Sequence, residues 1–138
     1  MTVLNTVAQV AALVGALAYL GAAPLELFFF DRPWARKFLH VEVGNAGNLD
    51  DVRMWAFVVG FRNVLAGIGT IVGLVILQTG DETVGAAVVV TSCAYMLLAS
   101  LAMGVADALG YWRPRGGSVL GTVASSLPPL VALVAAAA

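Results

Sequence analysis

Charged residues are scarce in this sequence: they make up 11% of its 138 residues, whereas hydrophobic residues make up 61%. An ordinary soluble domain carries about 25% charged residues. The mean hydropathy of +0.95 points the same way. This scarcity excludes a soluble globular domain, because so much apolar surface exceeds what one small core can bury. The sequence also lacks any run of basic residues, and so no nucleic acid partner is predicted.

Cysteine and histidine occur once each, as Cys93 and His40. A single cysteine can form neither an intrachain disulfide nor a multi-cysteine metal site, and we interpret Cys93 as a small buried residue. His40 has no second histidine or cysteine cluster beside it. We therefore interpret it as a solvated surface residue rather than a metal ligand or a catalytic base. No metal and no cofactor are predicted.

Long apolar segments are what the sequence has in abundance. Four segments are nearly free of charge, and each reaches the ~20 residues that a helix needs to cross a bilayer core of about 30 Å. The sequence therefore predicts an all-α fold, an integral membrane four-helix bundle formed by a single domain over residues 1–138. The predicted spans are roughly residues 3–30, 54–78, 83–109 and 118–138.

The first apolar segment is in the position of a secretory signal, but it has the wrong pattern for one. Residues 1–10 contain no Lys or Arg, and the apolar stretch runs well beyond the ~7 to 15 residues of a signal sequence. We expect it to be a retained spanning helix.

Lys and Arg gather in two of the three loops between the predicted spans, and the middle turn QTGDET has none. Because short loops rich in Lys and Arg are retained in the cytoplasm, we expect both basic loops there and both termini outside. The cations are Arg32, Arg36, Lys37 and Arg53 in the loop at residues 31–53, and Arg113 and Arg115 in the loop after the third span.

The loop at residues 31–53 has the pattern of a short amphipathic interfacial helix between the first and second spans. Asp31 is a candidate cap with Pro33 in the first turn, and apolar residues then recur at one-turn spacing from Trp34. Such a helix lies on the membrane surface. The second span is predicted to begin at a cap on Asn48.

Arg62 is the most unusual residue of the spans, because it interrupts the apolar run FVVGFRNVLAGIG. It lies nine residues from Arg53, which is about 13 Å along a helix. Burying a guanidinium costs about 2.5 to 3.5 kcal/mol on insertion scales. We predict that Arg62 pairs with Glu26, Asp107 or both, because these carboxylates lie near the same ends of neighbouring spans. The predicted intramembrane polar cluster is Tyr19, Glu26, Arg62, Asn63 and Asp107.

Three motifs, LELFFFDRP, GFRNVLAGIG and SSLPPLVALV, resemble those of a bacterial family of small four-helix membrane proteins catalogued as domain of unknown function 1304. The resemblance implies a four-span protein of the bacterial inner (plasma) membrane and no established activity. The sequence departs from the family pattern where Arg62 stands in place of a tyrosine, and where Ala18 and Tyr19 replace a Glu-His pair. The matching positions are Glu26, Gly60, Phe61, Asn63, Ile68, Gly69 and Pro128.

Two classes of function stay open at this point. The first is binding or transport of a small molecule or lipid headgroup at the polar cluster. The second is an intramembrane enzyme acting on a lipid or quinone-like substrate, with Glu26 as acid or base and Arg62 as an electrostatic anchor. The sequence favours the first, because no nucleophile and base are spaced for covalent catalysis. A structural clamp, a homo-oligomer in the lipid bilayer and an accessory subunit of a membrane complex are further interpretations of the same residues.

Overall fold

The computed structural model describes residues 3–42 and 49–138, and these residues form helices without any strand. Four of the helices are long and apolar enough to cross a membrane, and a short helix lies where the interfacial helix is predicted. The predicted fold class is therefore confirmed. The helices are α1 (Thr6–Leu27), α2 (Pro33–Phe38), α3 (Leu49–Thr79), α4 (Glu82–Ala108) and α5 (Val119–Ala137).

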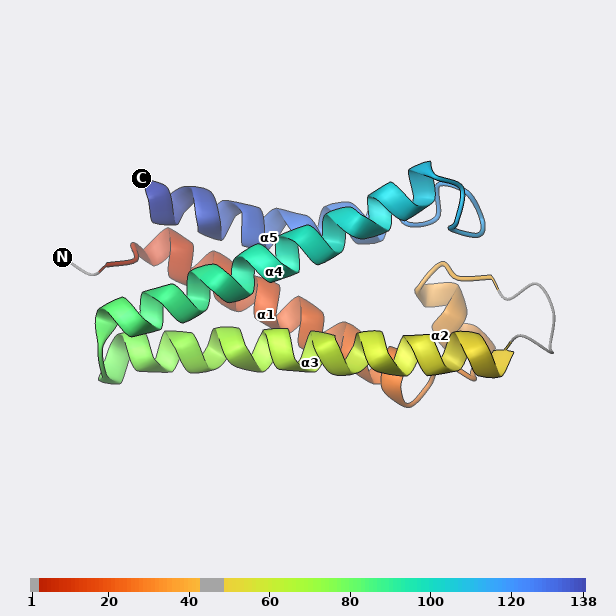
Figure 1. Ribbon diagram of the computed structural model, residues 1–138, viewed down its shortest axis with the longest axis horizontal. Coiled ribbons are helices and arrows are strands. Elements are labelled where there is room, and N and C mark those ends of the chain that lie inside the picture. The colour runs from red at the N-terminus through yellow and green to blue at the C-terminus, as the bar shows by residue number, and fades with distance from the viewer. Residues whose placement is uncertain (1–2, 43–48) are drawn as a thin grey trace.

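The four long helices form an antiparallel bundle in which each packs against two neighbours (Figure 1). Helix α1 lies between α3 and α5, and α4 packs against the same two helices on the opposite side. Helices α1 and α4 also touch across the diagonal. Consecutive spans connected by short loops run in opposite directions, and this arrangement brings both chain ends to one end of the bundle (Figure 1).

Glycine allows α1, α3 and α4 to approach one another closely. A Cβ atom on Gly67 would lie 2.6 Å from Leu20 Cγ and 3.0 Å from the Ala16 carbonyl oxygen of α1. A Cβ atom on Gly85 of α4 would lie 2.6 Å from Leu77 Cα of α3. Without a hydrophobic force between helices in lipid, such close packing is the main source of their association.

Helix α3 begins at Leu49, earlier than the predicted span, and the predicted cap residue Asn48 lies outside the described residues. Asp50 and Asp51 occupy the first turn of α3. Acidic residues there interact favourably with the positive end of the helix dipole, so the helix continues past the apolar segment. Its 31 residues span about 46 Å, which exceeds the thickness of a bilayer core.

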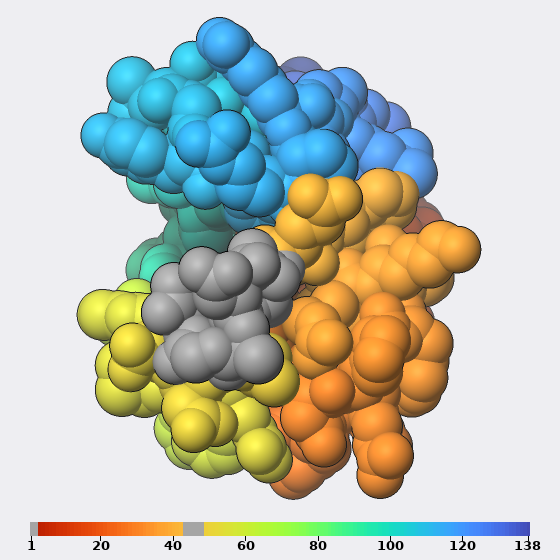
Figure 2. Space-filling view, turned by 90° about the vertical axis from the view of Figure 1, so that its right-hand side faces the viewer, coloured from red at the N-terminus to blue at the C-terminus, as the bar shows by residue number. Residues whose placement is uncertain are grey.

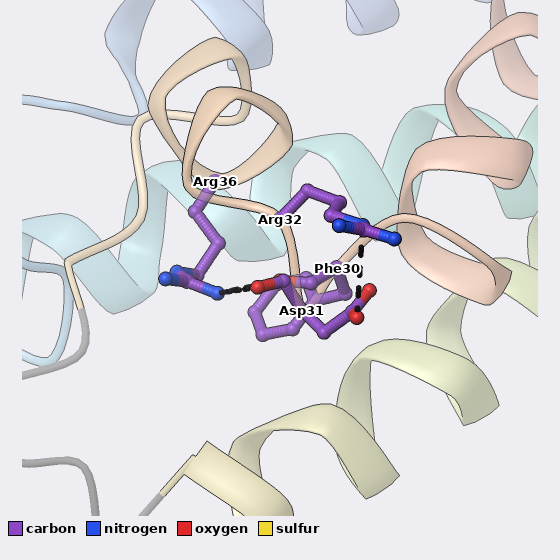
Figure 3. Close-up of polar contacts among 4 residues, drawn as sticks. All are labelled: Phe30, Asp31, Arg32 and Arg36. Atoms are coloured by element: carbon purple, nitrogen blue, oxygen red, sulfur yellow. Dashed lines mark hydrogen bonds and ion pairs between the residues drawn. The ribbon is translucent and has the colours of Figure 1, made fainter.

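Helix α2 is held at the end of α1 by an arginine rather than by the predicted Asp31 cap (Figure 3). The N-cap residue is Arg32, because Pro33 takes the first helical position, where its missing N–H costs nothing. Arg36 Nη1 donates to the Phe30 and Asp31 carbonyl oxygens at 2.9 and 2.8 Å. Figure 3 also shows the carboxylate of Asp31 turned to Arg32, with 3.9 Å between Arg32 Nε and Asp31 Oδ2.

The two basic loops meet at one end of the bundle, which we call the basic end (α2, the start of α3 and residues 109–118). Trp112 Nε1 donates to the His40 carbonyl oxygen at 2.9 Å, and the backbone N–H of Glu42 donates to the Arg113 carbonyl oxygen at 2.9 Å. Figure 2 looks onto this end and shows the orange first loop against the blue loop between α4 and α5. The fold therefore gathers the cations of both loops on one side, and their cytoplasmic location stays a prediction.

The orientation can be tested by labelling single cysteines at the two ends of the bundle. In a Cys93→Ala background, we expect a membrane-impermeant maleimide to label Thr79→Cys in intact cells and Lys37→Cys only in inverted membranes. Both positions are exposed, and Cys93 is fully buried. The Cys93→Ala parent is the control for background labelling. Equal labelling of both cysteines from one side would contradict four crossings with an external N-terminus.

Candidate functional site

The five residues of the predicted polar cluster lie in separate places in the bundle. Glu26 and Asn63 form one pair, Tyr19 contacts α4, Asp107 binds the start of α5, and Arg62 stands apart. The chemistry available to Arg62 depends on what the other four residues already bind.

Glu26 and Asn63 link α1 to α3. Asn63 Nδ2 donates to Glu26 Oε2 at 2.7 Å. The two helices come close enough for this bond at Gly60, where a Cβ atom would lie 2.9 Å from Glu26 Cβ and 3.2 Å from the Ala23 carbonyl oxygen. A hydrogen bond to a carboxylate stabilises by about 1.5 to 3 kcal/mol, so this pair fixes the register of the two helices.

Tyr19 links the diagonal pair, α1 and α4. Its hydroxyl donates to the Met96 carbonyl oxygen and is 2.7 Å from Ser100 Oγ. The carbonyl can only accept, so the single hydroxyl proton of Tyr19 goes to it and Ser100 donates to the Tyr19 oxygen. Tyr19 and Ser100 are 6% and 1% exposed, which makes this a dry contact inside the bundle. Ser100 shares a face with Asp107 in the sequence pattern, but nothing there identifies it as the partner of Tyr19.

Asp107 caps helix α5 across the loop that joins α4 to it. Its Oδ1 accepts the Gly116 backbone N–H at 2.7 Å, and its Oδ2 accepts the Ser118 N–H at 2.9 Å and the Ser118 hydroxyl at 2.8 Å. The N-cap residue Ser118 makes no capping hydrogen bond with its own side chain. Asp107 therefore satisfies N–H groups that a helix start would otherwise leave unpaired, and its charge interacts favourably with the helix dipole.

Arg62 makes no hydrogen bond or ion pair with any residue that the structure describes, and its side chain is exposed. The predicted pairing of Arg62 with Glu26 or Asp107 is therefore wrong. Successive residues on a helix point about 100° apart, and Asn63 takes the direction that faces α1. Arg62 consequently points away from Glu26.

Arg62 belongs to a stripe on α3 that changes from exposed to buried along the helix. Trp55 and Val59, at one-turn spacing before Arg62, are 61% and 43% exposed. The stripe continues through Ala66 and Thr70, which are buried. One face of a helix changes from buried to exposed where the neighbouring helix no longer covers it. Figure 1 shows α4 diverging from α3 toward the basic end.

We call the exposed part of this stripe, where α4 diverges from α3, the α3–α4 opening (Trp55, Val59 and Arg62). Figure 2 shows the surface indented between the yellow start of α3 and the cyan end of α4. The opening therefore offers one cation at a recess that faces the lipid.

The described residues offer no obvious metal centre: within residues 3–42 and 49–138, no three His, Cys, Asp or Glu side chains could jointly hold a metal ion.

Comparison with known proteins connects the chain to one family. The family model described as "Protein of unknown function (DUF1304)" matches residues 12–137. No curated protein and no solved structure matches the chain. The match covers nearly the whole sequence, and it confirms the family resemblance of the three motifs that contain Glu26, Arg62 and Pro128. With its four long apolar helices and this match, the chain belongs to the DUF1304 family.

Proposed function

We propose that this protein binds an anionic lipid of the cytoplasmic leaflet, with Arg62 in the α3–α4 opening as the anchor for the lipid headgroup. The observation that carries the proposal is the exposed guanidinium of Arg62 on a membrane-spanning helix, which has no hydrogen-bond or ion-pair partner among the described residues. The proposal includes a bacterial inner membrane as the location, with the basic end in the cytoplasm.

The depth of Arg62 makes an unpaired charge expensive. Fifteen residues separate it from Leu77 at the other end of α3, which is about 22 Å along the helix. With Leu77 near one edge of a core about 30 Å thick, Arg62 lies about 8 Å inside the other edge. A charge inside the core costs about 2.5 to 3.5 kcal/mol on insertion scales. Glu26 and Asp107 have other partners, so a lipid headgroup is the counterion nearest at hand.

The geometry favours a headgroup with a single negative charge. Arg53 lies nine residues from Arg62 and therefore on the opposite side of α3, about 180° away. Only one cation of α3 faces the opening. A guanidinium binds a phosphate or carboxylate through two parallel hydrogen bonds, and one phosphodiester matches its charge. The exposed ring of Trp55 stands at the level where aromatic side chains contact the glycerol region of lipids.

The proposal is tested by comparing Arg62→Gln with Arg53→Gln in native mass spectrometry of the protein extracted with phosphatidylglycerol. We expect Arg62→Gln to retain about tenfold less of this lipid, because a hydrogen bond to a charged group is worth at least 1.4 kcal/mol. Arg53→Gln is the matched control and should retain it like the unmodified protein. Thermal stability in lipid-free detergent should be unchanged in both, because neither arginine forms a hydrogen bond or ion pair with the residues that the structure describes. Equal lipid retention by Arg62→Gln and Arg53→Gln would reject the proposal.

A further inference from the structure

A second recess lies on the other side of α4, between this helix and α5 at the basic end. We call it the α4–α5 groove; it is open to the surface and has a volume of about 340 Å³. Its walls are small or apolar where the helices face each other, at Gly104, Ala108 and Val119. Neither Arg62 nor any other residue of α3 lines it. The groove is therefore a separate feature from the α3–α4 opening.

The groove carries one charge of each sign. Asp107 and Arg115 both line it, and Arg115 is exposed and pairs with no described residue. An ionised carboxylate has about four lone-pair sites, and Gly116 and Ser118 occupy three of those on Asp107. The fourth site accepts no hydrogen bond from the described residues, and Asp107 is 6% exposed. A carboxylate and a guanidinium at one recess are complementary to a ligand that carries both an ammonium and a phosphate.

The lining of the groove also contains a polar atom that has no partner among the described residues. The side-chain oxygen of Thr122 is enclosed and makes no hydrogen bond with these residues. Thr122 packs over Gly104, because a Cβ atom there would lie 3.2 Å from Thr122 Cγ2. Enclosing a hydroxyl without a hydrogen bond is unfavourable, so this wall of the groove is not fully satisfied by the protein itself.

We propose that the α4–α5 groove binds a zwitterionic phospholipid with a primary ammonium group. Its phosphate binds Arg115, its ammonium donates to Asp107, and one acyl chain lies along Gly104, Ala108 and Val119. An anionic lipid such as phosphatidylglycerol fits less well, because its headgroup has no ammonium to balance the charge of Asp107. A quaternary ammonium fits less well too, because it has no N–H to donate to the Asp107 carboxylate. The groove would thus distinguish lipids by their ammonium group, whereas the single cation of the α3–α4 opening recognises only their phosphate.

The test measures thermal stabilisation of the purified protein in detergent by added phosphatidylethanolamine, phosphatidylcholine and phosphatidylglycerol. Ala108→Leu fills the groove without removing a charge, and Ala102→Leu is its matched control, since Ala102 is also an exposed alanine of α4 but does not line the groove. We expect Ala108→Leu to lose the stabilisation by phosphatidylethanolamine and Ala102→Leu to keep it. Arg115→Gln, which changes an exposed side chain, should raise the concentration of this lipid needed for half the effect about fivefold.

Each outcome separates the lipid from other occupants. The proposal is supported if phosphatidylethanolamine stabilises the protein more than the other two lipids do, and if Ala108→Leu removes this stabilisation while Arg62→Gln keeps it. Equal stabilisation by all three lipids would overturn it, as would an unchanged response in Ala108→Leu. A loss of dimers in Ala108→Leu, with no lipid response in any variant, would overturn it in favour of a second copy of the chain.

Discussion

Replacing Gly85 with alanine is expected to lower the unfolding free energy by about 3 kcal/mol, at the upper end of what overpacking costs. The added Cβ would meet the backbone nitrogen of Leu77, lie 2.6 Å from its Cα, and lie 2.9 Å from the Gly73 carbonyl oxygen. These are backbone atoms, so no side chain can rotate away to make room. Helices α3 and α4 would have to separate next to the turn that joins them.

Gly21→Ala is the control for this prediction. Gly21 lies in helix α1, and a Cβ there would have nothing within 4 Å. Alanine should leave the stability unchanged or raise it by about 0.5 to 1 kcal/mol through helix propensity. Unfolding by titration with a denaturing detergent, followed by circular dichroism, measures both variants. Similar stabilities for the two variants would contradict the close contact between α3 and α4.

Replacing Asp107 with alanine is expected to lower the unfolding free energy by about 3 kcal/mol, because it leaves two N–H groups and one hydroxyl without their acceptor. The start of α5 would be the first part to loosen, since Ser118 offers no capping bond of its own. Asp107→Asn keeps one acceptor oxygen, so its unfolding free energy should fall by less than that of the alanine variant.

The same detergent titration measures the Asp107 variants, and hydrogen exchange at residues 116–122 locates the change. Faster exchange confined to this segment is the expected pattern. Glu26→Gln is the matched control, because it neutralises a carboxylate on a different helix pair and should leave exchange at the start of α5 unchanged. If Asp107→Ala unfolds at the same denaturant concentration as the unmodified protein, the capping role is wrong.

The fold could be predicted from the sequence because few physical requirements decide it. A span without charges must be helical in lipid, where every backbone group needs an internal partner. Helix α2 was predictable from Pro33 and from the spacing of Trp34 and Phe38, both of which are exposed, as an interfacial helix requires. Its cap was predicted wrongly at Asp31, because the N-cap is Arg32 and the carbonyl oxygens of Phe30 and Asp31 accept from Arg36 instead.

The site was predictable only in part. The sequence predicts Glu26, Arg62 and Asn63 as members of one polar cluster, but it cannot show that Glu26 meets Asn63 instead of the adjacent Arg62. That choice depends on the rotation of α3, which close contacts such as that at Gly67 determine. The sequence does not indicate that α4 diverges from α3 either, since the apolar residues Trp55 and Val59 would fit buried positions equally well.

The most direct test is a structure of the protein determined in a lipid bilayer that contains phosphatidylglycerol. We expect elongated non-protein density in the α3–α4 opening, with its headgroup within hydrogen-bond distance of the Arg62 guanidinium and its chain between α3 and α4. The result that would contradict lipid anchoring is an α4 closed against α3, with Arg62 in an ion pair with Glu26 or Asp107 and no lipid between the helices.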